Sequence, residues 1–135
     1  MPVLFSTKRV ALAALAAVVA GSTGCAGLKQ PFSQVDGRRY FLTNIDTFPV
    51  LIIRVDDRDT LDNPTFIEPG LRKVVVQGPP DGARRFGEQR TFELNAAPCK
   101  RYYLVAVKPN RLVADFTVRI DFEEPIGGCS IAPSK

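Results

Sequence analysis

The stretch DFTVRIDFE, residues 115–123, alternates apolar and polar side chains without a break. Its apolar positions are Phe116, Val118, Ile120 and Phe122, and the polar positions between them are Thr117, Arg119 and Asp121. Because successive side chains of a β-strand point to opposite faces, this alternation predicts a strand whose apolar set faces inward and whose polar set faces outward.

Several other segments have the same character and are separated by turn residues. The clearest is KRYYLVAVK at 100–108, and shorter strands are expected at 39–43, 50–55, 65–67, 72–77 and 90–94. No window has a helical period, while 10 Gly and 11 Pro interrupt the chain. We therefore predict an all-β fold, a small antiparallel β-sandwich of six or seven strands.

The first residues of the chain have the features of an export signal. Lys8 and Arg9 precede an unbroken apolar run, VALAALAAVVA at 10–20, and small residues then lead to Cys25. This order of charge, apolar run and small residues is typical of a secretory signal, and the run is too short to span a bilayer as a helix.

The sequence around Cys25 resembles the lipobox of bacterial lipoproteins. Gly24 and Ala26 flank the cysteine as that motif requires, whereas Ser22 stands where an aliphatic residue is usual. The resemblance implies cleavage before Cys25 and acylation of its new amino terminus. An alanine after the cysteine implies the outer membrane, at its periplasmic face. The alternative is cleavage after Ala20 or Ala26, which would leave a soluble periplasmic protein.

The chain is thus expected to have three parts. Residues 1–24 form the signal peptide, 25–34 the lipidated cysteine and a flexible tether, and 35–135 the β-domain, which is the size of one small domain. The formal net charge is +4, and two of the cations lie in the signal peptide. This mild positive charge excludes nucleic acid as an expected partner.

Cys99 and Cys129 are the two cysteines that follow Cys25. An even pair in an exported chain predicts a disulfide, and the absence of histidine makes a zinc site a poor alternative. Cys99 precedes one predicted strand and Cys129 follows another. If those strands are antiparallel, the start of the first lies beside the end of the second, and the bond would join them at one end of the sheet.

Two further segments resemble known β-domains. They are IEPGLRKVVV at 67–76, where Pro69-Gly70 fits a type II turn, and PCKRYYLVA at 98–106. Together they resemble the small PEGA-like domains of bacterial envelope lipoproteins, over roughly residues 45–108. The resemblance implies a sandwich and an envelope setting, and it brings no catalytic residues.

The residues usual in catalytic or metal sites are scarce. Without histidine the commonest general base is missing, and the serines lie in the signal and in terminal regions, so we expect no enzyme and no cofactor. Four aspartates at 56, 57, 59 and 62 lack the glycine and glutamate of a calcium loop, and Arg54 and Arg58 offset their charge. We interpret them as a solvated turn, with no metal.

Basic residues are the remaining candidates for binding. Arg84 and Arg85 belong to a turn-rich loop at 78–87, and Lys100 and Arg101 begin a strand. They could contact lipid A phosphates, peptidoglycan carboxylates or another envelope protein, or they could be an ordinary charged surface. The sequence favours a lipid-anchored envelope protein with a binding or scaffolding role. The alternatives are a soluble periplasmic binder, inhibitor or chaperone-like protein that adds a strand at a sheet edge, and an enzyme without histidine.

Overall fold

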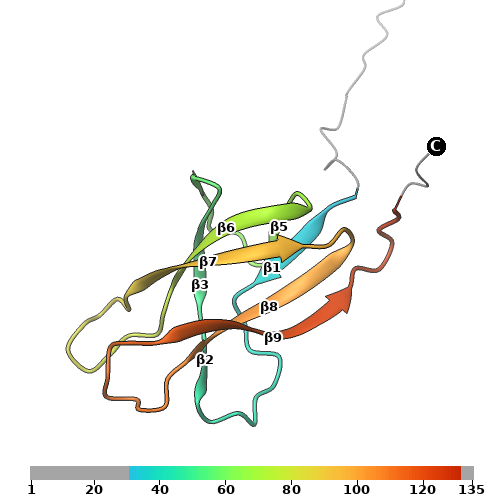
Figure 1. The fold of residues 1–135 in the computed structure, drawn as a ribbon. Helices are drawn as coiled ribbons and strands as arrows, with labels where there is room; N and C mark the ends of the chain where they lie inside the picture. Colours follow the sequence, from blue (N-terminus) through green and yellow to red (C-terminus); the bar gives the residue numbers. More distant parts are fainter. Residues whose placement is uncertain (1–30, 132–135) are drawn as a thin grey trace, which may run out of the picture.

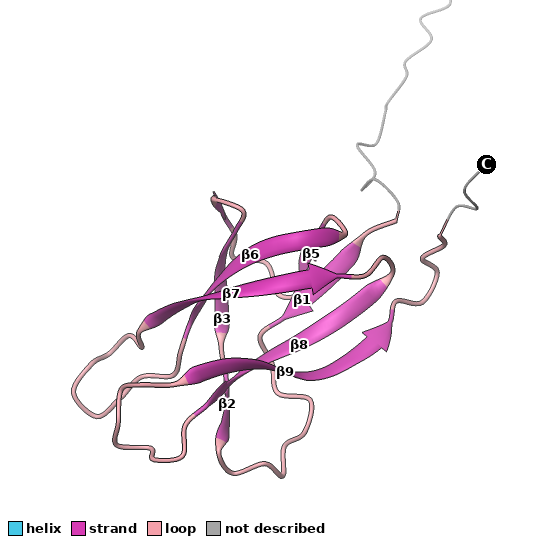
Figure 2. Ribbon diagram, in the orientation of Figure 1, coloured by secondary structure: helices cyan, strands magenta, loops and turns pink. Residues whose placement is uncertain are grey.

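The computed structural model describes residues 31–131 of the chain. Within them the chain forms nine β-strands joined by loops, and no helix (Figure 2). The strands are β1 Ser33–Asp36, β2 Thr47–Pro49, β3 Leu51–Val55, β4 Arg58–Asp59, β5 Thr65–Ile67, β6 Gly70–Gln77, β7 Gln89–Ala96, β8 Lys100–Val107 and β9 Thr117–Pro125. The predicted all-β class is confirmed, with more strands than expected because β1, β2 and β4 were not recognised.

The strands form two sheets (Figure 1). Sheet A has five strands and is built around β8, which pairs along its whole length with antiparallel β9. The other side of β8 is therefore shared by β1, which is parallel to it, and by β2, which is antiparallel; β5 then pairs with β1. Sheet B has four strands in the order β4-β3-β6-β7, all antiparallel. The predicted antiparallel pairing thus holds except for β1 and β8.

The core lies between the two sheets and consists of side chains from the strands of both. Sheet A contributes Val35 and Leu104, and sheet B contributes Ile52, Val74 and Leu94, each at most 2% exposed. Burying a side chain of this size stabilises the folded state by roughly 1.5–3 kcal/mol. In β7 the alternation of apolar and polar residues sets the buried face, whereas β3, β6 and β8 have apolar residues at consecutive positions.

The predicted strand at 39–43 is wrong, because these residues belong to a loop between β1 and β2. Two backbone N–H groups that a strand would use, those of Tyr40 and Phe41, instead donate to Asp121 Oδ2. Arg39 donates to the carbonyl of Thr47 at 2.9 Å and so bends the loop back on itself. The loop lies over the outer face of sheet A, where the ring of Tyr40 contacts those of Tyr103 and Phe122.

The predicted faces of residues 115–123 are correct only for the first half of the segment. Phe116 is buried in the core and Val118 packs against it. The pairing then shifts, since Tyr103 lies opposite Phe122 and Leu104 opposite Ile120, so Asp121 is an extra residue in a β-bulge.

The bulge reverses the expected directions of the later side chains in β9. Phe122 lies on the outer face, where Tyr40 stacks on it with ring centroids 3.8 Å apart. Ile120 precedes the bulge and keeps the expected face, opposite the core residue Leu104, although it is 39% exposed at the edge of the sheet. Asp121 was expected to face solvent, yet its side chain is only 1% exposed.

The predicted tether of residues 25–34 overlaps the first strand. Ser33 and Gln34 are buried residues of β1, and Ser33 Oγ donates to the carbonyl of Ala97 at 2.7 Å. Cys25, residues 26–30 of the tether and the predicted signal peptide lie outside the described residues.

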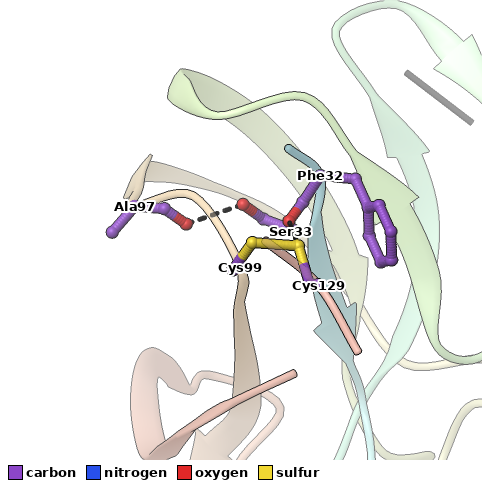
Figure 3. The surroundings of a disulfide bond; sticks show 5 residues. All are labelled: Phe32, Ser33, Ala97, Cys99 and Cys129. Atoms are coloured by element: carbon purple, nitrogen blue, oxygen red, sulfur yellow. Dashed lines mark hydrogen bonds between the residues drawn. A yellow bond between two sulfur atoms is a disulfide. The ribbon is translucent and has the colours of Figure 1, made fainter. Parts of the chain in front are cut away.

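The predicted disulfide between Cys99 and Cys129 is present, with the two Cα atoms 5.5 Å apart (Figure 3). It joins the start of β8 to the segment that follows β9, as the antiparallel pairing of these strands requires. The backbone N–H of Cys99 also donates to the carbonyl of Phe32 at 2.8 Å. Both ends of the described chain are therefore fixed beside the start of β8.

Candidate interaction surface

The structure does not bring the four predicted partner-binding cations together. Arg84 and Arg85 belong to the loop between β6 and β7, whereas Lys100 and Arg101 begin β8, near the ends of the described chain (Figure 1). These two pairs lie at opposite ends of the sandwich. They cannot act as one site.

The cations of β8 are engaged within the domain. Arg101 Nε donates to Gln34 Oε1 at 2.7 Å, and its Nη1 lies 3.5 Å from Glu124 Oε1. Lys100 Nζ lies 3.2 Å from Glu123 Oε2. Tyr103 donates its hydroxyl proton to Glu124, and burial together with this carboxylate raises the pKa of Tyr103. This cluster holds β1, β8 and β9 side by side.

The cations of the β6–β7 loop are more accessible. Arg84 is paired with Glu88 at 3.3 Å but its side chain is 60% exposed. Arg85 is exposed and forms no ion pair with any residue between 31 and 131. Of the four predicted residues, Arg85 is the one most open to a ligand.

Three loops lie at the end of the sandwich opposite residues 31 and 131 (Figure 1). They are residues 37–46 between β1 and β2, 78–88 between β6 and β7, and 108–116 between β8 and β9, and we call them the distal loops. The backbone N–H of Lys108 donates to the carbonyl of Asp46 at 2.9 Å, which joins the first loop to the third. The ring of Phe116 packs directly on Gly78, which joins the third to the second.

The distal loops expose large apolar side chains that sequence reasoning missed. Leu42 is 73% exposed, Ile45 72%, Phe86 70% and Leu112 86%. The signal that could have found them is apolar residues outside any alternating segment, next to turn residues such as Pro109-Asn110. A shallow groove of about 340 Å³ lies beside one of them, Phe86, and is also lined by Pro79, Pro80 and Arg85.

Two of the four aspartates at 56–62 are paired with arginine. Asp56 accepts from Arg72 Nη1 at 2.8 Å and from the backbone N–H of Lys73, and these contacts lower its pKa. Asp59 pairs with Arg54 at 2.8 Å. They border a hollow of about 460 Å³, and among residues 31–131 no group of three acidic or thiol side chains is placed to hold a metal ion.

No protein-family model, curated protein sequence or solved structure matches the chain. The likeness to PEGA-like domains of envelope lipoproteins therefore stays a prediction from the residues at 67–76 and 98–106. Within residues 31–131, no helix is long and apolar enough to cross a membrane. The Cys99–Cys129 disulfide indicates an oxidising, extracytoplasmic compartment.

Proposed function

We propose that this protein is anchored to the cell envelope by acyl chains on Cys25 and serves there as a binding or scaffolding domain. The observation that carries the proposal is the export signal with Cys25 at its exit, followed by a domain with a disulfide. An exported chain meets the oxidising conditions in which such a bond persists. Two or more acyl chains hold a protein on a membrane without a spanning helix.

The geometry of the domain supports a role in presentation. The chain enters β1 through Phe32, beside the disulfide, whereas the distal loops lie at the other end (Figures 1 and 3). A domain held through residues before Phe32 therefore directs its exposed loop residues away from the attachment point. Its outer-membrane, periplasmic location is part of this proposal.

The intact mass of the mature protein, purified from membranes of its native host, tests the proposal. We expect the mass of residues 25–135 plus acyl groups. A mass that begins at Gly21 or Gly27 and carries no lipid would contradict the anchor. That result would instead establish a soluble exported protein.

A second candidate, a soluble binder that accepts a strand from its partner, is favoured by one observation. β7 is an edge strand of eight residues that pairs with β6 without a register shift. Its other edge offers a regular row of backbone groups to an added strand, whereas the bulge at Asp121 interrupts the edge of β9. Slower amide hydrogen exchange in β7 upon partner binding would support this candidate, and unchanged exchange there would exclude it.

A further inference from the structure

We propose that the distal loops form a docking surface that inserts into an anionic lipid bilayer. The inference rests on the proposed function only for its setting at a membrane. Because the distal loops lie at the end of the domain opposite the attachment point, the bilayer that they enter is a second one, facing the membrane that holds the anchor. Its contacts come from the loops themselves and do not require Cys25 to be acylated.

The first argument is the placement of apolar side chains. Each distal loop carries at least one large apolar residue with 70% or more of its surface exposed, namely Leu42, Ile45, Phe86 and Leu112. Transfer of such side chains from water into the acyl boundary of a bilayer is favourable in proportion to their apolar area. Three loops held together by Lys108, Asp46, Phe116 and Gly78 present them as one end of the molecule.

The second argument is charge. Arg85 is exposed without an ion pair in the described chain, and Arg111 is exposed over the ring of Phe48. Most carboxylates of the same loops are already engaged. Glu88 pairs with Arg84 and Arg90, Asp115 pairs with Arg90, and Asp81 accepts from the backbone N–H groups of Ala83 and Arg84. The unpaired cations therefore complement the phosphates of an anionic surface.

The third argument concerns shape, and it favours lipid over a protein partner. The apolar residues stand on three separate loops, and the groove beside Phe86 is shallow. A protein would need a matching pocket for each residue, whereas a fluid bilayer adjusts to separate protrusions. Arginine side chains beside the apolar residues would lie at the level of the headgroups.

Sedimentation with vesicles tests the proposal. The mature chain, residues 25–135 with Cys25→Ser, is mixed with vesicles of phosphatidylcholine alone or of phosphatidylcholine and phosphatidylglycerol in equal parts. We expect preferential binding to the anionic vesicles. Adding Leu42→Ser, Phe86→Ser and Leu112→Ser should lower the partition coefficient between anionic vesicles and water by at least roughly tenfold. A second variant, Arg85→Glu with Arg111→Glu, should lose the preference for the anionic vesicles.

Matched controls separate the loops from the rest of the chain. Leu61→Ser, Leu71→Ser and Ile131→Ser remove three equally exposed apolar residues outside the distal loops and should leave binding unchanged. A polarity-sensitive fluorophore on Asn110→Cys should shift to the blue with anionic vesicles, and one on Glu68→Cys, between β5 and β6, should not.

Equal vesicle binding by the loop variant and its parent, or equal shifts at the two labelled positions, would overturn the proposal. The distal loops would then be a surface for a protein. Because every variant contains Cys25→Ser, neither result depends on acylation. The outcome is therefore separate from that of the intact-mass measurement.

Discussion

Two buried carboxylates hold the β1–β2 loop onto sheet A. Asp36 accepts hydrogen bonds from the backbone N–H and the guanidinium of Arg38 at the start of the loop. Asp121, on β9, accepts from Tyr40 and Phe41 in its middle. Neither carboxylate is more than 1% exposed. Removing the donors would leave a buried carboxylate without hydrogen bonds, which lowers the free energy of unfolding.

We predict that Asp121→Ala detaches the loop from β9. Two backbone N–H groups would lose their acceptor, and the stacking of Tyr40 on Phe122 would loosen with them. The free energy of unfolding should fall by about 1–3 kcal/mol. Urea denaturation measures this, and near-ultraviolet circular dichroism should show a weakened tyrosine signal. Asp115→Ala, which removes an exposed ion pair, is the control and should cost no more than about 1 kcal/mol.

Asp36 should make the domain sensitive to acid. Burial raises the pKa of Asp36, but the hydrogen bonds and charge of Arg38 outweigh it, so the folded pKa lies below the ordinary value of 3.8. A lowered pKa stabilises the folded state above the unfolded value, and this contribution is lost as the pH falls through the folded value. Asp36→Asn should therefore be less stable than its parent at pH 7. The difference should shrink below about pH 4. A difference that stays constant down to pH 2 would argue against this role.

We expect Gly78→Ala to disturb the contact between two distal loops. A methyl group at Gly78 would overlap the buried ring of Phe116, so one of the two must move. Such overpacking costs about 1–3 kcal/mol, which thermal unfolding can detect. Gly82→Ala, in the same loop with open space around it, is the matched control and should leave the melting temperature nearly unchanged.

At the level of elements, strands rich in apolar and β-branched residues could be predicted from the sequence, as in β3, β6, β7 and β8. Only in β7 do apolar residues at every second position also fix the buried face. The strands β1 (SQVD) and β2 (TFP) have no such pattern. Both owe their conformation to hydrogen bonds with β8, which lies far away in sequence.

The candidate sites were predictable to different degrees. The Cys99–Cys129 bond could be predicted from two cysteines in a chain that begins with a predicted export signal. The opposite placement of Arg84 and Lys100 did not, because it depends on how the two sheets pack. The bulge at Asp121 also escaped prediction, since an uninterrupted alternation in β9 gives no sign that an extra residue reverses its faces.

Loss of the disulfide should weaken the domain as a whole. The two cysteines are 30 positions apart. Closing a loop of this length lowers the conformational entropy of the unfolded chain and so raises the free energy of unfolding by roughly 3–4 kcal/mol. We expect the double variant Cys99→Ala and Cys129→Ala to unfold at a lower urea concentration by a corresponding amount. In a strong thiol reductant, the parent protein should unfold at the same urea concentration as the double variant. If reduction changes nothing, the bond contributes little to stability.

The molecule as a whole has two unlike ends. One holds the disulfide, residue 31 and residue 131, and the other holds the exposed apolar residues of the distal loops (Figure 1). This polarity suits a domain that is fixed at one end and makes contacts at the other.

Cys25→Ser should move the protein from the salt-washed membrane fraction to the soluble fraction of its native host, because a high-salt wash weakens the attraction of the loop cations to anionic lipid but does not extract an acylated protein. The serine cannot carry the thioether-linked lipid, so any remaining membrane association must come from another surface. Fractionation followed by immunoblotting gives the measurement. Cys99→Ala is the control, which should lower stability but leave the location as in the parent. An unchanged location of the Cys25→Ser variant would count against the anchor.

The position of β1 has a mechanical consequence. This strand lies between β5 and β8, and the chain enters it directly from Phe32. Tension applied at Phe32 along the strand would shear the ladders on both sides at the same time, because their hydrogen bonds run across the direction of pull. An edge strand, by contrast, can be peeled away one bond after another. A domain tethered through β1 should therefore withstand pulling forces that would unravel one tethered through β7 or β9.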